Sequence, residues 1–201
     1  MKKHLPVAPL ALALLLGTTV AAMAHPPQYH ATIGGAAQAG FLHPFTGLDH
    51  LLVMIAVGLW AVQIGGRACW LLPTAFVGSM IIGGTIALSG IHLAVVESGI
   101  LASIVLLSAA LGMAWRPPLW SAALLIGAAG LCHGYAHGSE MAAGLIPSLF
   151  FVGMVIATSL LHGFGVTLGI ALQRHRLQFA TRIAGAALLA FAIYDCFYPV
   201  A

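Results

Sequence analysis

Charged side chains are scarce in this sequence, and their scarcity excludes most soluble folds. Only 5% of the 201 residues are Asp, Glu, Lys or Arg, whereas 61% are hydrophobic and the mean hydropathy is +1.06. A soluble domain carries about a quarter charged residues, because its surface must be hydrated. Most of this surface therefore contacts lipid, and we expect a polytopic membrane protein in a lipid bilayer.

Other features that would indicate common protein classes are also missing. The formal net charge is +3, but seven scattered basic residues are too few for a nucleic-acid-binding surface. The three cysteines include no CxxC pair, so they indicate neither a disulfide framework nor a redox motif. The sequence has no phosphate-binding loop of the GxxxxGK[ST] type, which argues against ATP-driven pumping by this chain alone.

The N-terminal residues have the pattern of a secretory signal peptide. Two lysines form a positive region, residues 10–20 are apolar, and Ala22-Met23-Ala24 is a small-x-small cleavage site. The alternative is a first transmembrane helix, but the apolar run is short for a span of about 20 residues. We predict that residues 1–24 are removed after Ala24 and that the mature N-terminus is periplasmic.

Six apolar stretches follow, and turn formers or charged residues separate them. Each has about the length that a helix needs to cross a bilayer. We therefore predict an all-α helix bundle that forms one transmembrane domain over residues 25–201 and begins with a short periplasmic tail at 25–42. The six predicted spans are 47–65, 69–89, 95–114, 119–138, 142–172 and 178–197.

All five arginines fall at the same ends of these predicted spans. With a periplasmic N-terminus these ends are cytoplasmic, in agreement with the excess of positive charge that cytoplasmic loops carry. The sequence thus predicts a multi-pass protein of the bacterial inner membrane. The arginines are Arg67, Arg116, Arg174, Arg176 and Arg182.

Histidine and carboxylate side chains gather at the opposite, periplasmic ends of the predicted spans. Ionisable groups in membrane spans are costly to bury, and they often mark ion pathways. This one-sided distribution is the strongest indication of function in the sequence. The residues are His43, Asp49, His50, His92, Glu97, His133, His137, Glu140 and Asp195.

The first dense motif, HPFTGLDH at residues 43–50, opens the first predicted span. His43 and His50 are seven residues apart, close to two helical turns, so they would share a face of a helix that begins at the proline. Asp49 would ligate a metal ion or orient an imidazole, and Met54 lies one turn after His50. The alternative is that these groups only cap the helix at the membrane interface.

The second dense motif, HGYAHGSE at residues 133–140, ends the fourth predicted span. His133, His137 and Glu140 would project from one stripe of a helix. Two imidazoles and a carboxylate suit nickel, cobalt, zinc or iron. The two glycines predict an irregular backbone, which is tolerated at membrane depth where it lines a cavity. The alternative is a histidine pair that only holds helices together.

Further polar residues are weaker candidates for metal ligands or pathway residues. His162 lies deep in the fifth predicted span, where it would be a hydrogen-bonded core residue or a relay toward the cytoplasm. His92, Glu97 and Asp195 would ligate a metal ion, form pairs or lie among lipid headgroups. His25, at the predicted mature N-terminus, would chelate a metal ion through its amine and imidazole.

The motifs His43-x5-Asp49-His50 and His133-Gly134-x-x-His137-Gly138-x-Glu140 closely resemble those of the HupE/UreJ family of small membrane proteins. The resemblance extends over essentially the whole mature chain. It implies a secondary permease for nickel, and in some settings cobalt, linked to the maturation of nickel hydrogenases and ureases. It also implies that the motif histidines and carboxylates are the metal ligands. Cys132 stands where the family often has phenylalanine, which leaves those ligands intact.

We therefore predict a protein without enzymatic activity or prosthetic group, whose transported substrate is Ni²⁺ or Co²⁺. The ion would pass from the periplasm to the cytoplasm. Two alternatives remain, a membrane-bound metal-dependent enzyme and a metal-sensing accessory scaffold. A histidine-box oxygenase would need more than one HxxxH motif, and a sensor would need a larger cytoplasmic surface than these short loops provide.

Overall fold

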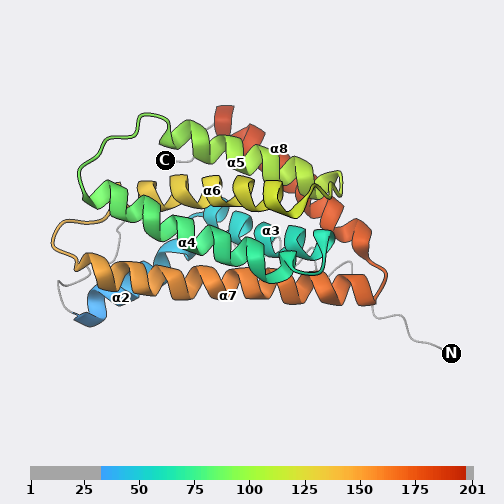
Figure 1. Cartoon of the computed structure of the whole chain (residues 1–201), viewed down its shortest axis with the longest axis horizontal. Helices are drawn as coiled ribbons and strands as arrows, with labels where there is room; N and C mark the ends of the chain where they lie inside the picture. The colour runs from blue at the N-terminus through green and yellow to red at the C-terminus, as the bar shows by residue number, and fades with distance from the viewer. Residues whose placement is uncertain (1–32, 198–201) are drawn as a thin grey trace.

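The computed structural model describes the backbone of residues 33–197, and all side chains in this range except those of residues 33, 48, 49 and 195–197. These residues form helices and no strands, so the all-helical prediction is confirmed for them (Figure 1). The predicted signal peptide lies outside the described residues. The elements are α2 (Ile33–Leu42), the 3₁₀ turn η1 (His43–Phe45), α3 (Leu48–Ile64), α4 (Ala68–Leu88), α5 (Val96–Gly112), α6 (Leu119–Ser139), α7 (Pro147–Arg174) and α8 (Gln178–Phe197).

Each of the six predicted spans corresponds to one helix from α3 to α8, and most ends agree within two residues. The start of α7 differs. It was predicted at residue 142, but the helix begins at Pro147, and the preceding residues form turns that include Gly144 at a positive φ of 88°. Proline suits the first helical position because it needs no hydrogen-bond partner for its nitrogen there.

By length and composition, three of the described helices can cross a membrane on their own, namely α4, α6 and α7. Residues 34–45 and 50–64 would add a fourth span if they are counted together, because they form an apolar pair bent by 72°. Helices α5 and α8 are also apolar, but their apolar stretches, Val96–Gly112 and Gln178–Tyr194, are shorter than a single span requires. These criteria support three to four spans, and the count of six stays a prediction.

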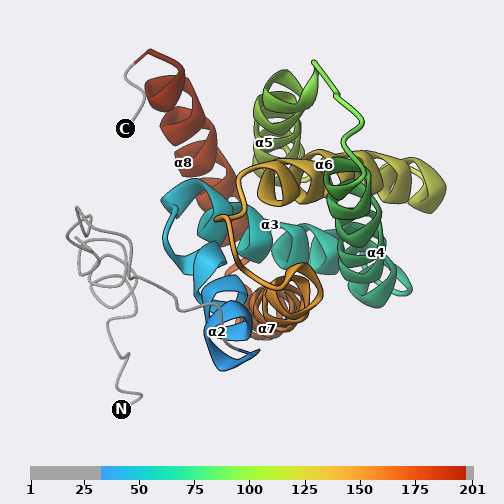
Figure 2. The same cartoon turned by 90° about the vertical axis from the view of Figure 1, so that its left-hand side faces the viewer.

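Helix α2 forms within the segment that the sequence analysis treated as a periplasmic tail. It lies along α7 (Figure 2), and the two backbones touch. A Cβ atom added to Gly40 would collide with the carbonyl oxygen of Phe150, and one added to Gly153 would collide with that of Ala37. Small residues permit such close helix pairs in membranes. The chain before the first motif is therefore packed against the bundle.

Helices α4 and α6 also pack backbone to backbone. A Cβ atom added to Gly134 would collide with the carbonyl oxygen of Met80, and one added to Gly130 would collide with that of Phe76. Helix α6 stays continuous through this region to Ser139, so the predicted irregular backbone at the second motif is wrong. The glycines of that motif permit close packing and do not interrupt the helix.

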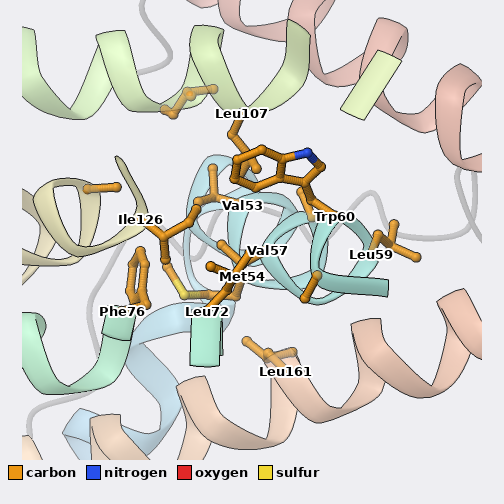
Figure 3. Close-up of a cluster of buried hydrophobic side chains, with 14 of the residues drawn as sticks. Val53, Met54, Val57, Leu59, Trp60, Leu72, Phe76, Leu107, Ile126 and Leu161 are labelled. Carbon is orange, nitrogen blue, oxygen red and sulfur yellow. The ribbon is translucent and has the colours of Figure 1, made fainter. Parts of the chain in front are cut away.

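The buried core is centred on α3, which α4, α5 and α7 contact from different sides. Figure 3 shows Val53, Met54 and Val57 of α3 packed with Phe76 of α4 and Ile126 of α6. All five side chains are at most 2% exposed. The core thereby joins the helices and lies between two polar ends of the bundle.

The end of the bundle that carries the arginines also holds a polar network. Gln63, near the end of α3, donates hydrogen bonds to the carbonyl oxygen of Leu111 and to the hydroxyl of Thr181, at 3.1 and 2.8 Å. Arg116 and Arg182 line a cavity of about 50 Å³ beside these groups. The histidines lie at the opposite end of the bundle, where α3 begins and α6 ends.

Candidate metal-binding site

Four imidazoles from three separate elements meet at one end of the bundle. They belong to His43 of η1, His50 of α3, and His133 and His137 of α6. Their ring centroids lie 4.5 Å apart for His43 and His137, 4.9 Å for His50 and His137, and 5.6 Å for His50 and His133. We call these four residues the histidine cluster. The histidines of the two motifs, which lie far apart in the sequence, thus meet in one place.

The first motif reaches this site by a break in the helix rather than by a shared helical face. The prediction of one helix from Pro44 is wrong, because η1 ends at Phe45 and Gly47 adopts an extended conformation before α3 begins. A helix containing both histidines would hold their rings on one stripe. The observed turn brings the His43 and His50 ring centroids within 6.1 Å from two different elements.

Hydrogen bonds constrain the protons of three cluster histidines. His43 Nε2 and His137 Nδ1 lie 2.9 Å apart, so the two rings share one proton when both are neutral. His133 Nδ1 lies 2.8 Å from the carbonyl oxygen of Ala129, one turn earlier on α6. Since a carbonyl only accepts, Nδ1 of His133 carries the proton and its Nε2 carries the lone pair, the form in which imidazole binds metals.

Exposure changes across the histidine cluster. His43 and His50 are half-buried, whereas His137 is 3% exposed and His133 is 1% exposed. Phenylalanine rings flank both pairs, with the Phe150 centroid 5.8 Å from half-buried His43 and the Phe76 centroid 5.5 Å from buried His133. The cluster therefore extends from half-buried imidazoles to fully buried ones.

Three other residues that the sequence predicted as metal ligands, two glutamates and one histidine, lie at the same end of the bundle but outside the histidine cluster. Glu140 is the exposed C-cap residue that follows α6, and Glu97 is exposed in the first turn of α5. His92 is exposed in the connection between α4 and α5. Tyr135 of α6 anchors that connection, since its hydroxyl donates to the carbonyl oxygen of Ile91 at 2.9 Å.

The remaining predicted candidates are described in part or not at all. The backbone of Asp49 lies in the first turn of α3, beside His50, but its side chain is outside the description. The same holds for Asp195 in the last turn of α8. His25 lies outside the described residues. The roles predicted for these three residues stay predictions.

The histidine cluster is not arranged as a ready-made metal centre. Among the described residues, no three His, Cys, Asp or Glu side chains are placed to hold one ion. The bond between His43 and His137 is one reason, because each ring directs a nitrogen at the other ring and not at a common point. Binding an ion here means breaking this hydrogen bond and moving its proton to the other nitrogen of its ring. The imidazole donors themselves fit nickel, cobalt or zinc.

His162 lies deeper in the bundle and is fully buried. Its Nδ1 lies 2.7 Å from the carbonyl oxygen of Met54, and its Nε2 has no hydrogen-bond partner among the described residues. Leaving such an acceptor unpaired costs about 1–3 kcal/mol. Met54, predicted as a pathway residue for its side chain, contacts His162 through its backbone.

Sequence reasoning missed the aromatic residues of the site. The Phe76 ring contacts His133 on one side and His162 on the other, with centroid distances of 5.5 and 5.1 Å. An isolated phenylalanine in an apolar span has no pattern that marks it, so only the packing of α4 against α6 and α7 reveals this position.

The fold and the site together define a class, a small all-helical membrane protein with histidines from several elements gathered at one end. The sequence profile of the HupE / UreJ protein family matches residues 12–194. The curated relative Protein HupE of Rhizobium leguminosarum bv. viciae is 38% identical over 174 residues, which cover 85% of this chain and 91% of that protein. No solved structure matches the chain. The chain belongs to the HupE/UreJ family, as its two motifs indicated.

Proposed function

We propose that this protein is a secondary permease that imports Ni²⁺, or failing that Co²⁺, from the periplasm into the cytoplasm. The observation that carries the proposal is the meeting of four imidazoles from η1, α3 and α6 at one end of an apolar helix bundle. Buried histidines in a membrane bundle are costly and are found where ions pass. Membership in the HupE/UreJ family supports a transporter over an enzyme.

Transport would begin at the half-buried pair, His43 and His50. An arriving cation would break the hydrogen bond between His43 and His137, whose proton would move to the other nitrogen of its ring, and the cation would then reach the buried imidazoles of α6. Neutral imidazoles hold a divalent ion less firmly than thiolates do, and weak binding at successive positions lets an ion leave again. Asp49, next to His50, would complete the site as a ligand or as the acceptor that orients an imidazole.

The direction of transport follows from the arginines. If the arginine-bearing end faces the cytoplasm, as basic loops do in bacterial inner membranes, the histidine cluster opens to the periplasm. The exposed carboxylates of Glu97 and Glu140 lie at that end and would attract cations toward it. Imported nickel would supply the maturation of nickel enzymes.

The proposal is tested by uptake of radioactive nickel in cells that lack other nickel importers. We expect accumulation above the empty-vector level, and a loss of about tenfold or more in His50→Ala and His137→Ala at normal membrane abundance. The matched control is His175→Ala, an exposed histidine at the arginine end. A wild-type protein that accumulates no more nickel than the empty vector would refute the proposal. Unlabelled cobalt added as a competitor tests the second substrate.

A further inference from the structure

His162 is the next imidazole inward from the histidine cluster. It lies fifteen residues after the start of α7, about 22 Å along the helix at 1.5 Å per residue, so it is near the middle of a span. The Phe76 ring contacts both His162 and His133, at centroid distances of 5.1 and 5.5 Å. The two histidines thus occupy successive levels of the bundle.

The protonation of His162 is defined by its hydrogen bond. The carbonyl oxygen of Met54 can only accept, so Nδ1 of His162 donates and Nε2 carries a lone pair. This lone pair is fully buried and has no partner among the described residues. Buried polar atoms are nearly always paired, and an orphaned one needs an explanation.

The orientation of His162 is built into the crossing of α3 and α7. A Cβ atom at Gly58 would collide with the carbonyl oxygen of His162, and one at Gly165 would collide with that of Ile55. Gly58 is also the residue whose N–H bonds to the Met54 carbonyl within α3, and its missing side chain leaves that carbonyl open to α7. The crossing therefore holds Nε2 with its lone pair unpaired.

A thioether lies about one helical turn nearer the histidine cluster than His162. Thr158, one turn before His162 on α7, places its hydroxyl oxygen 4.0 Å from the sulfur of Met80 on α4. Met80 and Thr158 are each 1% exposed. Imidazole nitrogen and thioether sulfur are ligands for borderline and soft transition metals, and not for magnesium or calcium.

We propose that His162 is a second, intramembrane metal-binding position, where Nε2 accepts the ion that the histidine cluster releases and the Met80 thioether is a weak flanking donor. This inference rests on the proposed permease function. It explains why an imidazole with an unpaired acceptor is held at this depth. It also makes the transported ion pass from nitrogen ligands to a mixed nitrogen and sulfur environment.

The test compares nickel transport by purified variants in liposomes. In His162→Asn the amide nitrogen takes the place of Nδ1 and keeps the bond to Met54, whereas the position of Nε2 is lost. We expect transport to fall about tenfold or more, while nickel binding at the histidine cluster and thermal stability stay at wild-type values. The matched control is Ser159→Ala, an exposed neighbour on the same helix, which should transport normally.

Failure of this inference differs from failure of the permease function. If wild type transports nickel and His137→Ala does not, but His162→Asn transports at the wild-type rate, only the second position is refuted. If His162→Asn does not fold, X-ray absorption spectroscopy of the nickel-loaded wild type tests the second metal-binding position instead. We expect a sulfur ligand that disappears in Met80→Leu, a substitution that conserves volume. A ligand shell without sulfur would overturn the proposal.

Discussion

The shared proton of His43 and His137 connects single-residue geometry to transport chemistry. Their nitrogens are 2.9 Å apart, and an ion that binds between them must take the place of that proton. In neutral imidazoles the displaced proton moves to another ring nitrogen, whereas an imidazolium must first lose a proton, so metal binding at low pH releases protons and depends on pH. His133 differs, because its Nδ1 donates to the Ala129 carbonyl and a metal ion that binds this ring would have to approach Nε2.

We expect nickel binding to weaken as the pH falls. A protonated imidazole has no lone pair for a metal, and neighbouring imidazolium ions repel each other and the cation. Protons compete with nickel for the same lone pairs, so the ratio of the nickel affinity at pH 5.5 to that at pH 7.5 should be well below one. Titration calorimetry of purified protein at the two pH values measures this ratio. Equal affinities, with no proton release in buffers of different ionisation enthalpy, would contradict the assignment.

At the scale of helices, glycine determines which backbones touch. Gly134 of α6 lies against the backbone of α4 at Met80, and Gly165 of α7 lies against α3 at Ile55. The second contact holds α7 against α3, where His162 reaches the Met54 carbonyl. In lipid there is little hydrophobic gain from pairing helices, so close packing of small residues supplies much of the stabilisation. The site therefore depends on residues that carry no chemistry themselves.

Gly134→Ala should destabilise the protein, because its new methyl group would collide with the Met80 carbonyl. Overpacking of this kind costs about 1–3 kcal/mol. Gly127→Ala, on the same helix, is the matched control, since a Cβ atom there has no neighbour within 4 Å. We expect a lower thermal unfolding midpoint in detergent for Gly134→Ala only. Equal midpoints for the two variants would show that the α4–α6 contact is looser than described.

Hydropathy predicted the helices well, but it did not predict the local geometry of the motifs. The apolar stretches became α3 to α8, because length and composition alone indicate a membrane helix. The segment IGGAAQAGFL formed α2 unpredicted, since its small residues give little periodic signal. The glycines of the second motif were misinterpreted because glycine ends helices in water and packs them in membranes. Pro44 lies within the short turn η1, and the extended backbone at Gly47 separates this turn from α3.

For the whole molecule, the sequence predicted that the motifs would share an end, but not how their side chains would meet. The one-sided distribution of histidine and carboxylate placed both motifs at one side of the membrane. Contact between His43 and His137 joins residues 94 positions apart, which no local spacing can predict. Phe76, which lies between two imidazoles, could be recognised only from helix packing. His133 and His137, four residues apart on one helix, were predictable from helical periodicity.

The polarity of the bundle gives a topological prediction. The arginine end should face the cytoplasm and the histidine end the periplasm. Single cysteines introduced by His92→Cys and His175→Cys, in a chain whose native cysteines are replaced by alanine, would report the two sides. We expect a membrane-impermeant thiol reagent to label position 92 in intact spheroplasts and position 175 only after permeabilisation. The opposite labelling pattern would invert the direction of the proposed transport.

The central claim is that imidazoles from separate elements hold the same ion, and a double-mutant cycle on nickel affinity tests it most directly. Purified wild type, His50→Ala, His137→Ala and the double variant would be titrated with nickel in lipid nanodiscs. If His50 of α3 and His137 of α6 bind one ion, the two losses should be non-additive by about 0.5–3 kcal/mol. Strictly additive losses, or affinities unchanged by either substitution, would contradict the shared site.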